Sequence, residues 1–342
     1  MLWKGKKVLI TGGTGFIGSW LVEALTDREA DITLLVKRDD PIGLDSIKHI
    51  RKKIKVVYGD VRDSSVINKA MKDMDMIYHL AAITQVMYAI KNPRETSEVD
   101  INGTMNILEA LRIENNEAFL IFASTDKVYG EPNYVPIDEN HVLDAKSPYD
   151  ASKLAADRLV QSYHTTYGLK TAISRCSNVI GGRDSNILRA LPSFVYFLIN
   201  NKKPIIRTSG GYIRDYMYVE DAVNALIKLG DKQELTNGHV FNFGTGNATS
   251  VIQLAELAIK NFGLHYNYEP VVLNKKATGE IEKQYLSWDK ADKILNWKPS
   301  VHLEEAVKRS VDWYKNNKWW LQVIEKTSYY YGLNINTIYG IN

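Results

Sequence analysis

The sequence predicts an α/β protein with a doubly wound parallel sheet and a smaller, discontinuous C-terminal lobe. In the first half of the chain, short β-branched runs alternate with helical patterns. A glycine-rich loop follows the first of these runs, and the regular alternation ends after residue 176. Strands and helices that alternate at this spacing form parallel sheets with right-handed crossovers.

The individual elements follow from the same patterns. Strands of the main sheet are expected at residues 7–10, 32–36, 55–58, 76–80, 119–123 and 171–174. Helices are expected between them, at residues 17–27, 66–71, 99–114 and 150–167. The later elements are a helix at 191–199, a strand at 204–207, a helix at 219–229, a strand at 240–242 and a helix near 303–314.

This order predicts two units that are each discontinuous in sequence. Residues 1–175 and about 215–246 are expected to form the main domain, and about 176–214 with 247–342 the second lobe. The tail beyond Lys318 is rich in Trp and Tyr. We expect it to pack against the second lobe rather than to form an oligomer contact.

The composition argues against several classes of protein. With 43 basic and 40 acidic residues, the net charge of +3 lacks the basic surplus of a nucleic-acid-binding protein. The single Cys176 cannot form an internal disulfide, and the seven histidines lack the spacing of a metal site. No stretch is apolar for long enough to cross a bilayer, so we expect a cytoplasmic protein without a membrane partner.

The loop after the first expected strand has the chemistry of a dinucleotide site. Its glycines, Gly12, Gly15 and Gly18, allow a tight turn and a close approach to a pyrophosphate. The helix that follows directs free N–H groups and a partial positive charge at the phosphates. The other residues predicted to contact the cofactor here are Thr14, Phe16 and Ile17.

The end of the second expected strand bears on the choice between NAD and NADP. An NAD site places a carboxylate there for the ribose hydroxyls, whereas this chain has Lys37 and Arg38. Two cations fit a 2′-phosphate better, so NADP is favoured over NAD unless both side chains simply face solvent. The remaining predicted cofactor contacts are Asp60 and Val61 near the adenine, and Leu80, Ala81 and Ala82 along the ribose.

Tyr149 and Lys153 are candidate catalytic residues at the start of the helix expected at 150–167. Their i, i+4 spacing places them on one helix face, one turn apart. An ammonium near a phenol favours the phenolate, which would make Tyr149 a base, and Lys153 can also bind the nicotinamide ribose. Tyr314 and Lys318 repeat the spacing in a polar C-terminal helix, where we expect a surface position.

Thr125, Asp126 and Lys127 follow the fifth expected strand, at the sheet edge where α/β proteins bind ligands. Thr125 can orient a sugar hydroxyl beside Tyr149. Asp126 and Lys127 supply an acid and a base in adjacent positions, as the elimination of water from neighbouring carbons requires. The alternative is structural, with Asp126 capping a turn and Lys127 in solvent.

Together these residues resemble the extended short-chain dehydrogenase/reductases, which have a Rossmann domain, over nearly the whole chain. The resemblance includes 102–104, 177–179 and 214–216 as well as the loops above. It implies that Asn178 contacts the sugar or diphosphate and that Arg214 pairs with the diphosphate. Gln85 and Arg207 complete the predicted substrate-binding residues.

Within this family, the Thr-Asp-Lys segment is most similar to CDP-glucose 4,6-dehydratases. The predicted function is therefore a nucleotide-sugar 4,6-dehydratase with a tightly held, recycled NAD(P). A nucleotide-sugar 4-epimerase is the first alternative, and a catalytically silent NAD(P)-binding regulatory protein is the second. The resemblance also implies a homodimer. The helices at 99–114 and 150–167 would form it in a four-helix contact in which Ala110, Leu111, Leu154, Ala155 and Leu159 could take part.

Overall fold

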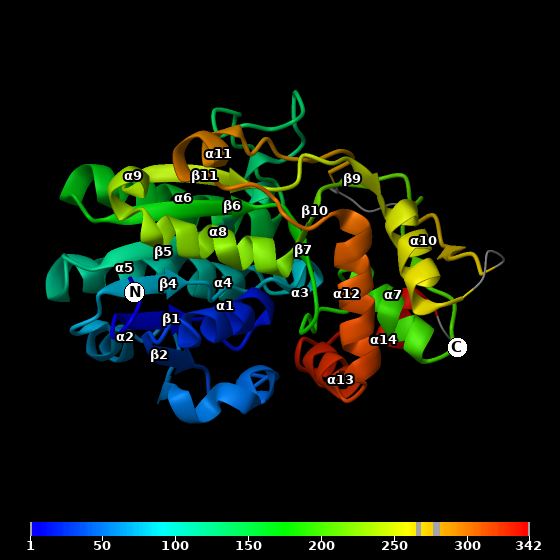
Figure 1. Cartoon of the computed structure of the whole chain (residues 1–342), viewed down its shortest axis with the longest axis horizontal. Helices are drawn as coiled ribbons and strands as arrows, with labels where there is room; N and C mark the ends of the chain where they lie inside the picture. Colours follow the sequence, from blue (N-terminus) through cyan, green and yellow to red (C-terminus); the bar gives the residue numbers. More distant parts are fainter. Residues whose placement is uncertain (1, 265–267, 276–280, 341–342) are drawn as a thin grey trace.

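The structure, a computed structural model, describes residues 2–264, 268–275 and 281–340. Its main sheet has seven parallel strands in the order β11-β6-β5-β4-β1-β2-β3, which confirms the predicted doubly wound fold (Figure 1). The strands are β1 (Lys7–Thr11), β2 (Asp31–Val36), β3 (Lys55–Tyr58), β4 (Met76–His79), β5 (Phe119–Thr125), β6 (Thr171–Cys176) and β11 (His239–Phe243).

Helices cover both faces of this sheet because its strands alternate between two apolar cores. Val8 and Ile10 of β1 join one core with α1 and α8, and Leu9 joins the other with α2 and α5. The helices of this half are α1 (Phe16–Thr26), α2 (Ser64–Met71), α3 (Val86–Lys91), α4 (Pro93–Ser97), α5 (Gly103–Glu114), α6 (Pro148–Tyr167), α8 (Val219–Asp231) and α9 (Gln233–Thr236). Shorter turns are η1 (Asp45–Lys53), η2 (Glu98–Asn102) and η3 (Asp126–Tyr129).

The topology creates a binding edge at the centre of the sheet. β1 lies between β4 and β2, so the connections that leave β1 and β4 run to opposite sides. Ligands of open α/β sheets bind outside the carboxyl ends of the strands at such a switch point. The loops after β1, β2, β4 and β5 therefore carry the candidate site.

A second group of elements lies to one side of the sheet, on the right in Figure 1. Three helices, α7, α10 and α12, pack on one another there. The group comprises α7 (Ala190–Ile199), α10 (Val251–Phe262), α12 (Leu303–Asn316), and the strands β7 (Asn178–Ile180), β8 (Ile205–Ile206), β9 (Ile213–Arg214), β10 (Tyr216–Tyr218), β12 (Thr249–Ser250) and β13 (Val271–Val272). Helix α11 (Asp289–Leu295) instead lies beside β11 of the main sheet.

The aromatic tail forms two further helices, α13 (Trp320–Tyr330) and α14 (Ile335–Tyr339). Trp320 is fully buried, and its ring packs edge-on against Trp313 of α12 at 5.5 Å. Tyr314 is also buried, and its hydroxyl donates to the carbonyl of Asp184 at 2.8 Å. The surface position predicted for Tyr314 is therefore wrong, because it belongs to the apolar face of α12 that the tail covers.

The helices of the predicted dimer contact are mostly engaged within the chain. Ala110 and Leu111 of α5 are each only 1% exposed, so they cannot meet a second subunit as predicted. Larger apolar side chains of the two helices do remain exposed, namely Met105, Ile113 and Tyr167.

Candidate active site

The glycine loop is shaped by a close approach of two backbone segments. Gly12 has a φ of +71°, and a Cβ on it would lie 2.6 Å from the backbone nitrogen of Ala81, beyond the end of β4. A Cβ on Gly18 would collide with the carbonyl of Gly12. Gly15 immediately precedes α1, whose first N–H groups open onto the loop. This cradle fits the pyrophosphate of a dinucleotide, because only glycines let the backbone come so close.

The other residues of the glycine loop contact side chains outside the loop. The Thr14 hydroxyl donates to the carboxylate of Asp40, four residues beyond β2. Phe16 is buried, with the Arg189 guanidinium 5.9 Å from its ring, and Ile17 is half-buried against the core. Asp40 supplies a carboxylate close to the cradle that the pattern at the end of β2 did not reveal, because the intervening loop folds back.

Lys37 and Arg38 lie directly after β2, and each has a partner. The Lys37 ammonium donates to the Tyr330 hydroxyl at 3.0 Å and is 3.4 Å from the Asp39 carboxylate. Burial opposes the charge, but these two partners raise the pKa of Lys37. The Arg38 guanidinium lies 5.2 Å from the ring of Tyr58 at the end of β3.

The remaining predicted cofactor contacts line the same edge. Asp60 follows β3 and receives three bonds from Arg62, at 2.8 to 3.0 Å. These bonds outweigh partial burial and lower the pKa of Asp60. Val61 is buried against Gly103, and Leu80, Ala81 and Ala82 are half-buried beyond β4.

Tyr149 and Lys153 occupy the first turns of α6, as predicted, but their electrostatics differ from the prediction. Lys153 is 4% exposed, and its ammonium donates to the Ala123 carbonyl at 2.8 Å. Burial raises the pKa of Tyr149, the carboxylate of Asp100 raises it further, and Arg189 opposes them. The net pKa of Tyr149 is therefore raised, whereas a lowering by the neighbouring ammonium of Lys153 was expected.

Asp100 and Arg189 are site residues that sequence reasoning missed. Asp100 lies in the π-helical turn η2, where its carboxylate accepts bonds from the Ile83 N–H and the Ser152 hydroxyl. π-turns within helices often mark functional sites, so η2 is a structural signal, but no sequence pattern announces it. Arg189 comes from the loop before α7 and pairs with Asp184 at 3.1 Å.

Thr125, Asp126 and Lys127 form a compact cluster at the carboxyl end of β5. Asp126 is 2% exposed, and the Lys127 ammonium lies 3.0 and 3.1 Å from its two oxygens. The Thr125 hydroxyl also bonds Asp126, at 3.2 Å. The alternative in which Lys127 lies free in solvent is wrong, because its partly exposed side chain is held in an ion pair with the buried Asp126.

Gln284 completes this cluster from the far end of the chain. Its side-chain oxygen accepts from Lys127 at 2.6 Å, and its amide nitrogen donates to the Asp126 carbonyl at 2.8 Å. Burial and the nearby Arg214 lower the pKa of Lys127, although Asp126 opposes that shift. No motif marks Gln284, because the packing of the second lobe brings it to β5.

Two predicted substrate residues carry buried polar atoms without a partner. Among the described residues, Gln85 Oε1, Ser177 Oγ and Asn178 Nδ2 are buried side-chain atoms that make no hydrogen bond. Such atoms are uncommon in folded proteins, and a bound ligand would satisfy them. They fit the polar groups of a sugar nucleotide.

The two predicted arginines lie in different places. Arg214 donates to the carbonyls of Ile213 and Glu282, and its charge acts on Lys127. Arg207 instead contacts Met87 Sδ at 3.6 Å, on the helix α3 that begins after Gln85. The structure thus places Arg214 near the cluster of Asp126 and Lys127, and Arg207 beside α3.

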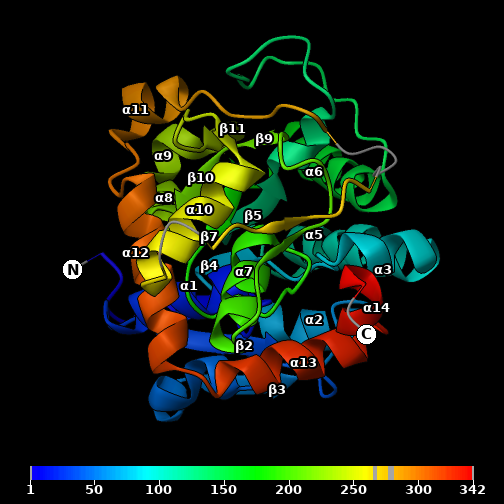
Figure 2. The ribbon, with the colours of Figure 1, turned by 90° about the vertical axis from the view of Figure 1, so that its right-hand side faces the viewer.

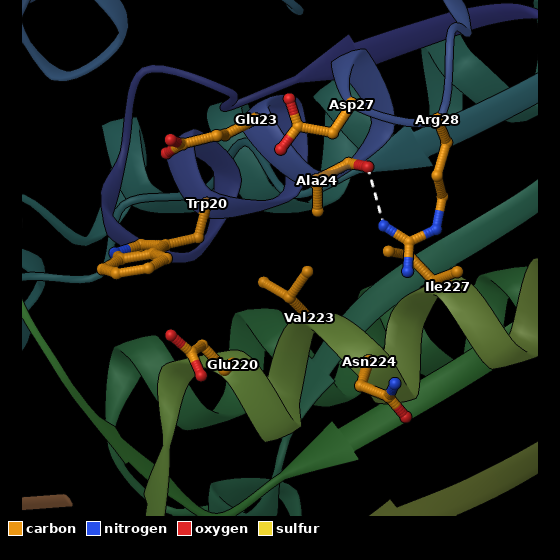
Figure 3. Close-up of a pocket in the computed structure, with 9 residues that line it drawn as sticks. All are labelled: Trp20, Glu23, Ala24, Asp27, Arg28, Glu220, Val223, Asn224 and Ile227. Atoms are coloured by element: carbon orange, nitrogen blue, oxygen red, sulfur yellow. Dashed lines mark hydrogen bonds between the residues drawn. The ribbon is translucent and has the colours of Figure 1, made fainter.

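A separate hollow lies between α1 and α8 and contains none of the predicted site residues (Figure 3). Its walls include Trp20, Val223 and the carboxylates of Glu23 and Glu220. No group of three or more His, Cys, Asp or Glu in the described parts of the chain could hold a metal ion. Within those parts there is also no helix of the length and apolarity that a membrane span needs.

The comparisons with known proteins agree with this geometry. Residues 9–310 match the family model of GDP-mannose 4,6 dehydratase. A Methanocaldococcus jannaschii protein, provisionally named a UDP-glucose 4-epimerase, is 35% identical over 91% of this chain and 99% of its own length. The dTDP-D-glucose 4,6-dehydratase of Mus musculus is 32% identical over 91% of this chain and 89% of its own.

Two similar solved structures are of proteins named for the same two activities, epimerase and dehydratase. The UDP-glucose 4-epimerase of Thermotoga maritima, solved with UDP-glucose, has a TM-score of 0.84 and 28% identity, and the match covers 91% of this chain and 99% of that one. The dTDP-glucose 4,6-dehydratase of Bacillus anthracis, solved with NAD, has a TM-score of 0.83 and 25% identity, covering 94% and 100%. The chain therefore belongs to the nucleotide-sugar 4,6-dehydratase and epimerase family of the extended short-chain dehydrogenase/reductases.

Proposed function

We propose that this chain is a nucleotide-sugar 4,6-dehydratase that acts on CDP-glucose or a close relative. The observation that carries the proposal is the ion pair of the buried Asp126 with the partly exposed Lys127 at the carboxyl end of β5. Oxidation at a single sugar carbon requires only a base such as Tyr149. An acid and a base held together beside that position add the chemistry of an elimination. The choice of CDP-glucose rests on the resemblance of the Thr-Asp-Lys segment.

In the proposed reaction, each catalytic acid or base transfers a proton to or from the sugar. A bound nicotinamide supplies a reversible store for the hydride that leaves C4 of the sugar and returns to C6. Tyr149 accepts the proton of the O4 hydroxyl, which Thr125 orients. The resulting 4-keto group acidifies C5–H, and Lys127 removes that proton while Asp126 protonates the departing O6 as water. Lys127 then returns its proton to C5, and the proton taken up by Tyr149 replaces the one that Asp126 gave away, so a 4-keto-6-deoxy sugar and water are the net products.

The ion pair is one proton transfer away from the state that this scheme requires. An ammonium cannot act as a base, and a carboxylate cannot act as an acid. Moving one proton from Lys127 Nζ to the Asp126 oxygen, across 3.0 Å, produces the neutral amine and the carboxylic acid together. Burial lowers the pKa of Lys127, which favours the neutral amine that the scheme requires. Gln284 keeps the amine facing the carboxylate during the transfer.

Asp126→Asn tests the elimination step. We expect it to lower the rate of 4-keto-6-deoxy product formation from CDP-glucose by about 100-fold or more, within the range of lost acid catalysis. Cofactor affinity should remain within twofold, because Asp126 does not contact the glycine cradle. Asp144→Asn, which changes an exposed carboxylate paired with Lys146, is the matched control and should keep the wild-type rate. Wild-type enzyme that forms no 4-keto-6-deoxy product from CDP-, GDP-, dTDP- or UDP-hexoses would refute the proposal.

A nucleotide-sugar 4-epimerase is the second candidate, and the relatives from M. jannaschii and T. maritima favour it. An epimerase uses the same oxidation by Tyr149 and returns the hydride to the opposite face of C4. It has no elimination for Asp126 to assist. Asp126→Asn should therefore leave an epimerase nearly unchanged, and the C4 stereochemistry of the product, read by NMR, distinguishes the two activities.

We further propose that the cofactor is NADP rather than NAD and that the chain forms a homodimer. Lys37 and Arg38, the two cations after β2, support NADP. The exposed Met105, Ile113 and Tyr167 of α5 and α6 support a dimer through these helices. Much tighter binding of NADH than of NADPH would refute the proposed NADP preference. Sedimentation as a monomer at micromolar concentration would refute the proposed homodimer.

A further inference from the structure

The C-terminal segment lies outside the family match and packs on the edge where the cofactor is expected. The match ends at residue 310, whereas α13 begins at Trp320. In Figure 2, α13 runs across the molecule in front of β2 and β3, and α14 lies near α3. This segment therefore lies beyond the residues that the family model matches, and it contacts the loops around the dinucleotide site.

Specific side chains connect α13 to the loop after β2. The Tyr330 hydroxyl accepts a bond from Lys37 at 3.0 Å and donates one to Asp39 at 3.1 Å. The next residue, Tyr331, packs edge-on against Tyr88 of α3 at a ring separation of 5.0 Å. At the other end of α13, buried Trp320 fixes the helix to α12. Both ends of α13 are held, so its exposed face has a defined position opposite the loop.

A pocket of about 510 Å³ lies between this face and the loop. Lys326 and Tyr330 are four residues apart, so they lie on one face of α13, and both line the pocket together with Arg38. The pocket's two carboxylates are already engaged, Asp39 by Lys37 and Tyr330, and Asp40 by Thr14. Within the described part of the chain, no ion pair engages Arg38 or Lys326. The pocket therefore offers two cations to an anion.

The pocket lies directly after β2, and this position indicates which anion it would bind. In doubly wound folds the residues after β2 meet the adenosine ribose, and a cation there meets a 2′-phosphate. We propose that this pocket is the subsite for the 2′-phosphate of NADP, and that Lys326 of the C-terminal segment is one of its ligands, opposite Arg38. The inference rests on the proposed use of NADP and adds a ligand from beyond the residues that the family model matches.

The test separates the 2′-phosphate from the rest of the cofactor. The probes are 2′,5′-ADP and 5′-AMP, which differ only in that phosphate, with NADPH and NADH as the complete pairs. Lys326→Ala should weaken 2′,5′-ADP and NADPH about tenfold, as the loss of one charge-assisted bond predicts. Binding of AMP and NADH should stay within twofold. Lys318→Ala, an exposed lysine at the start of the same segment, should change none of the four.

Each other outcome identifies what has failed. A wild-type chain that binds AMP as tightly as 2′,5′-ADP overturns both the proposed NADP preference and the subsite. A wild-type chain that prefers 2′,5′-ADP, with a Lys326→Ala variant that keeps the preference unchanged, overturns only the role of Lys326. An equal loss of all four ligands in Lys326→Ala also overturns it, because that pattern indicates a general effect on the loop. The dehydratase assay with CDP-glucose is independent of these outcomes.

Discussion

At the scale of single residues, burial determines which groups carry charge around the candidate site. Burial raises the pKa of Tyr149 and lowers the pKa of Lys127. Both shifts favour the neutral forms, which is the direction that desolvation imposes on an acid and on a base respectively. A bound cofactor and substrate bring new charges to this edge, so the proton positions needed for turnover depend on loading the site.

Gln284 should matter for catalysis although it supplies no acid or base. Gln284→Leu removes both bonds that fix Lys127 and Asp126 while keeping a side chain of similar size. We expect the dehydration rate to fall about tenfold, since a misplaced base loses much of its advantage. Exchange of the C5 hydrogen with solvent should fall in parallel, while the first oxidation, followed by reduced-nicotinamide absorbance, should persist. Normal C5 exchange in this variant would contradict a positioning role.

His79 should make the chain less stable in mild acid. It is fully buried between the hydroxyls of Thr11 and Thr104, and burial, with a smaller effect of Lys153, lowers its pKa to about 3. An unfolded histidine titrates near pH 6.5. Because the folded pKa is the lower one, this stabilisation is complete above pH 6.5 and is lost as the pH falls from there towards 3.

The measurement compares urea unfolding of wild type and His79→Gln between pH 7.5 and 4.5. Glutamine keeps hydrogen-bonding capacity but does not titrate, so the wild-type free energy of unfolding should fall more steeply towards acid, by up to about 3 kcal/mol across this range. His302→Gln, at an exposed histidine, is the control and should follow the wild type. Parallel curves for wild type and His79→Gln would show that His79 is not the acid-sensitive group.

At the scale of elements, the glycine loop depends on the contact between the end of β1 and the chain after β4. Gly12→Ala places a Cβ 2.6 Å from the Ala81 nitrogen and requires alanine to adopt a φ of +71°. We expect a loss of about 2–4 kcal/mol in unfolding free energy, from left-handed strain plus overpacking. Cofactor affinity should fall as well, because the loop must move.

Gly168 provides the matched control for this variant. It has a φ of +70° at the end of α6, but no atom lies within 4 Å of the position its Cβ would take. Gly168→Ala should therefore show the strain alone, about 1–2 kcal/mol, with normal cofactor binding. If the two alanine variants lose equal stability in chemical denaturation, the close approach at Gly12 is not what requires glycine there.

Helices, strands and loops with strong local patterns could be predicted from the sequence. Contacts between residues that are far apart in the sequence could not be predicted. The glycine loop, the strands of the main sheet and the start of α6 all follow from spacing within a few residues. Gln284, Arg189 and Asp100 have no such pattern, because tertiary packing alone brings them to β5 and α6. The sign of the Tyr149 shift was missed for the same reason, since it depends on burial and on distant charges.

At the scale of the whole molecule, the tail is an integral part of the fold. Trp320 is fully buried, and its indole N–H reaches the Asp184 carbonyl at 3.3 Å. Trp320→Ala should cost about 3–5 kcal/mol of unfolding free energy, as truncation of a large core side chain does. Trp319→Ala, next to it but 47% exposed, should cost less than about 1 kcal/mol. Equal and small losses in thermal unfolding would show that the tail is only loosely attached.

The bond between Lys37 and Tyr330 joins positions 293 residues apart, nearly the two ends of the chain. During synthesis the first βα units leave the ribosome well before α13 exists, and N-terminal parts generally begin to fold first. The glycine loop can thus form early, but the wall contributed by α13 arrives only after some 293 further residues have been added. A nascent chain that has not yet been extended through α13 would hold the dinucleotide at an unfinished edge, so this wall of the site is complete only once α13 has packed against the loop after β2.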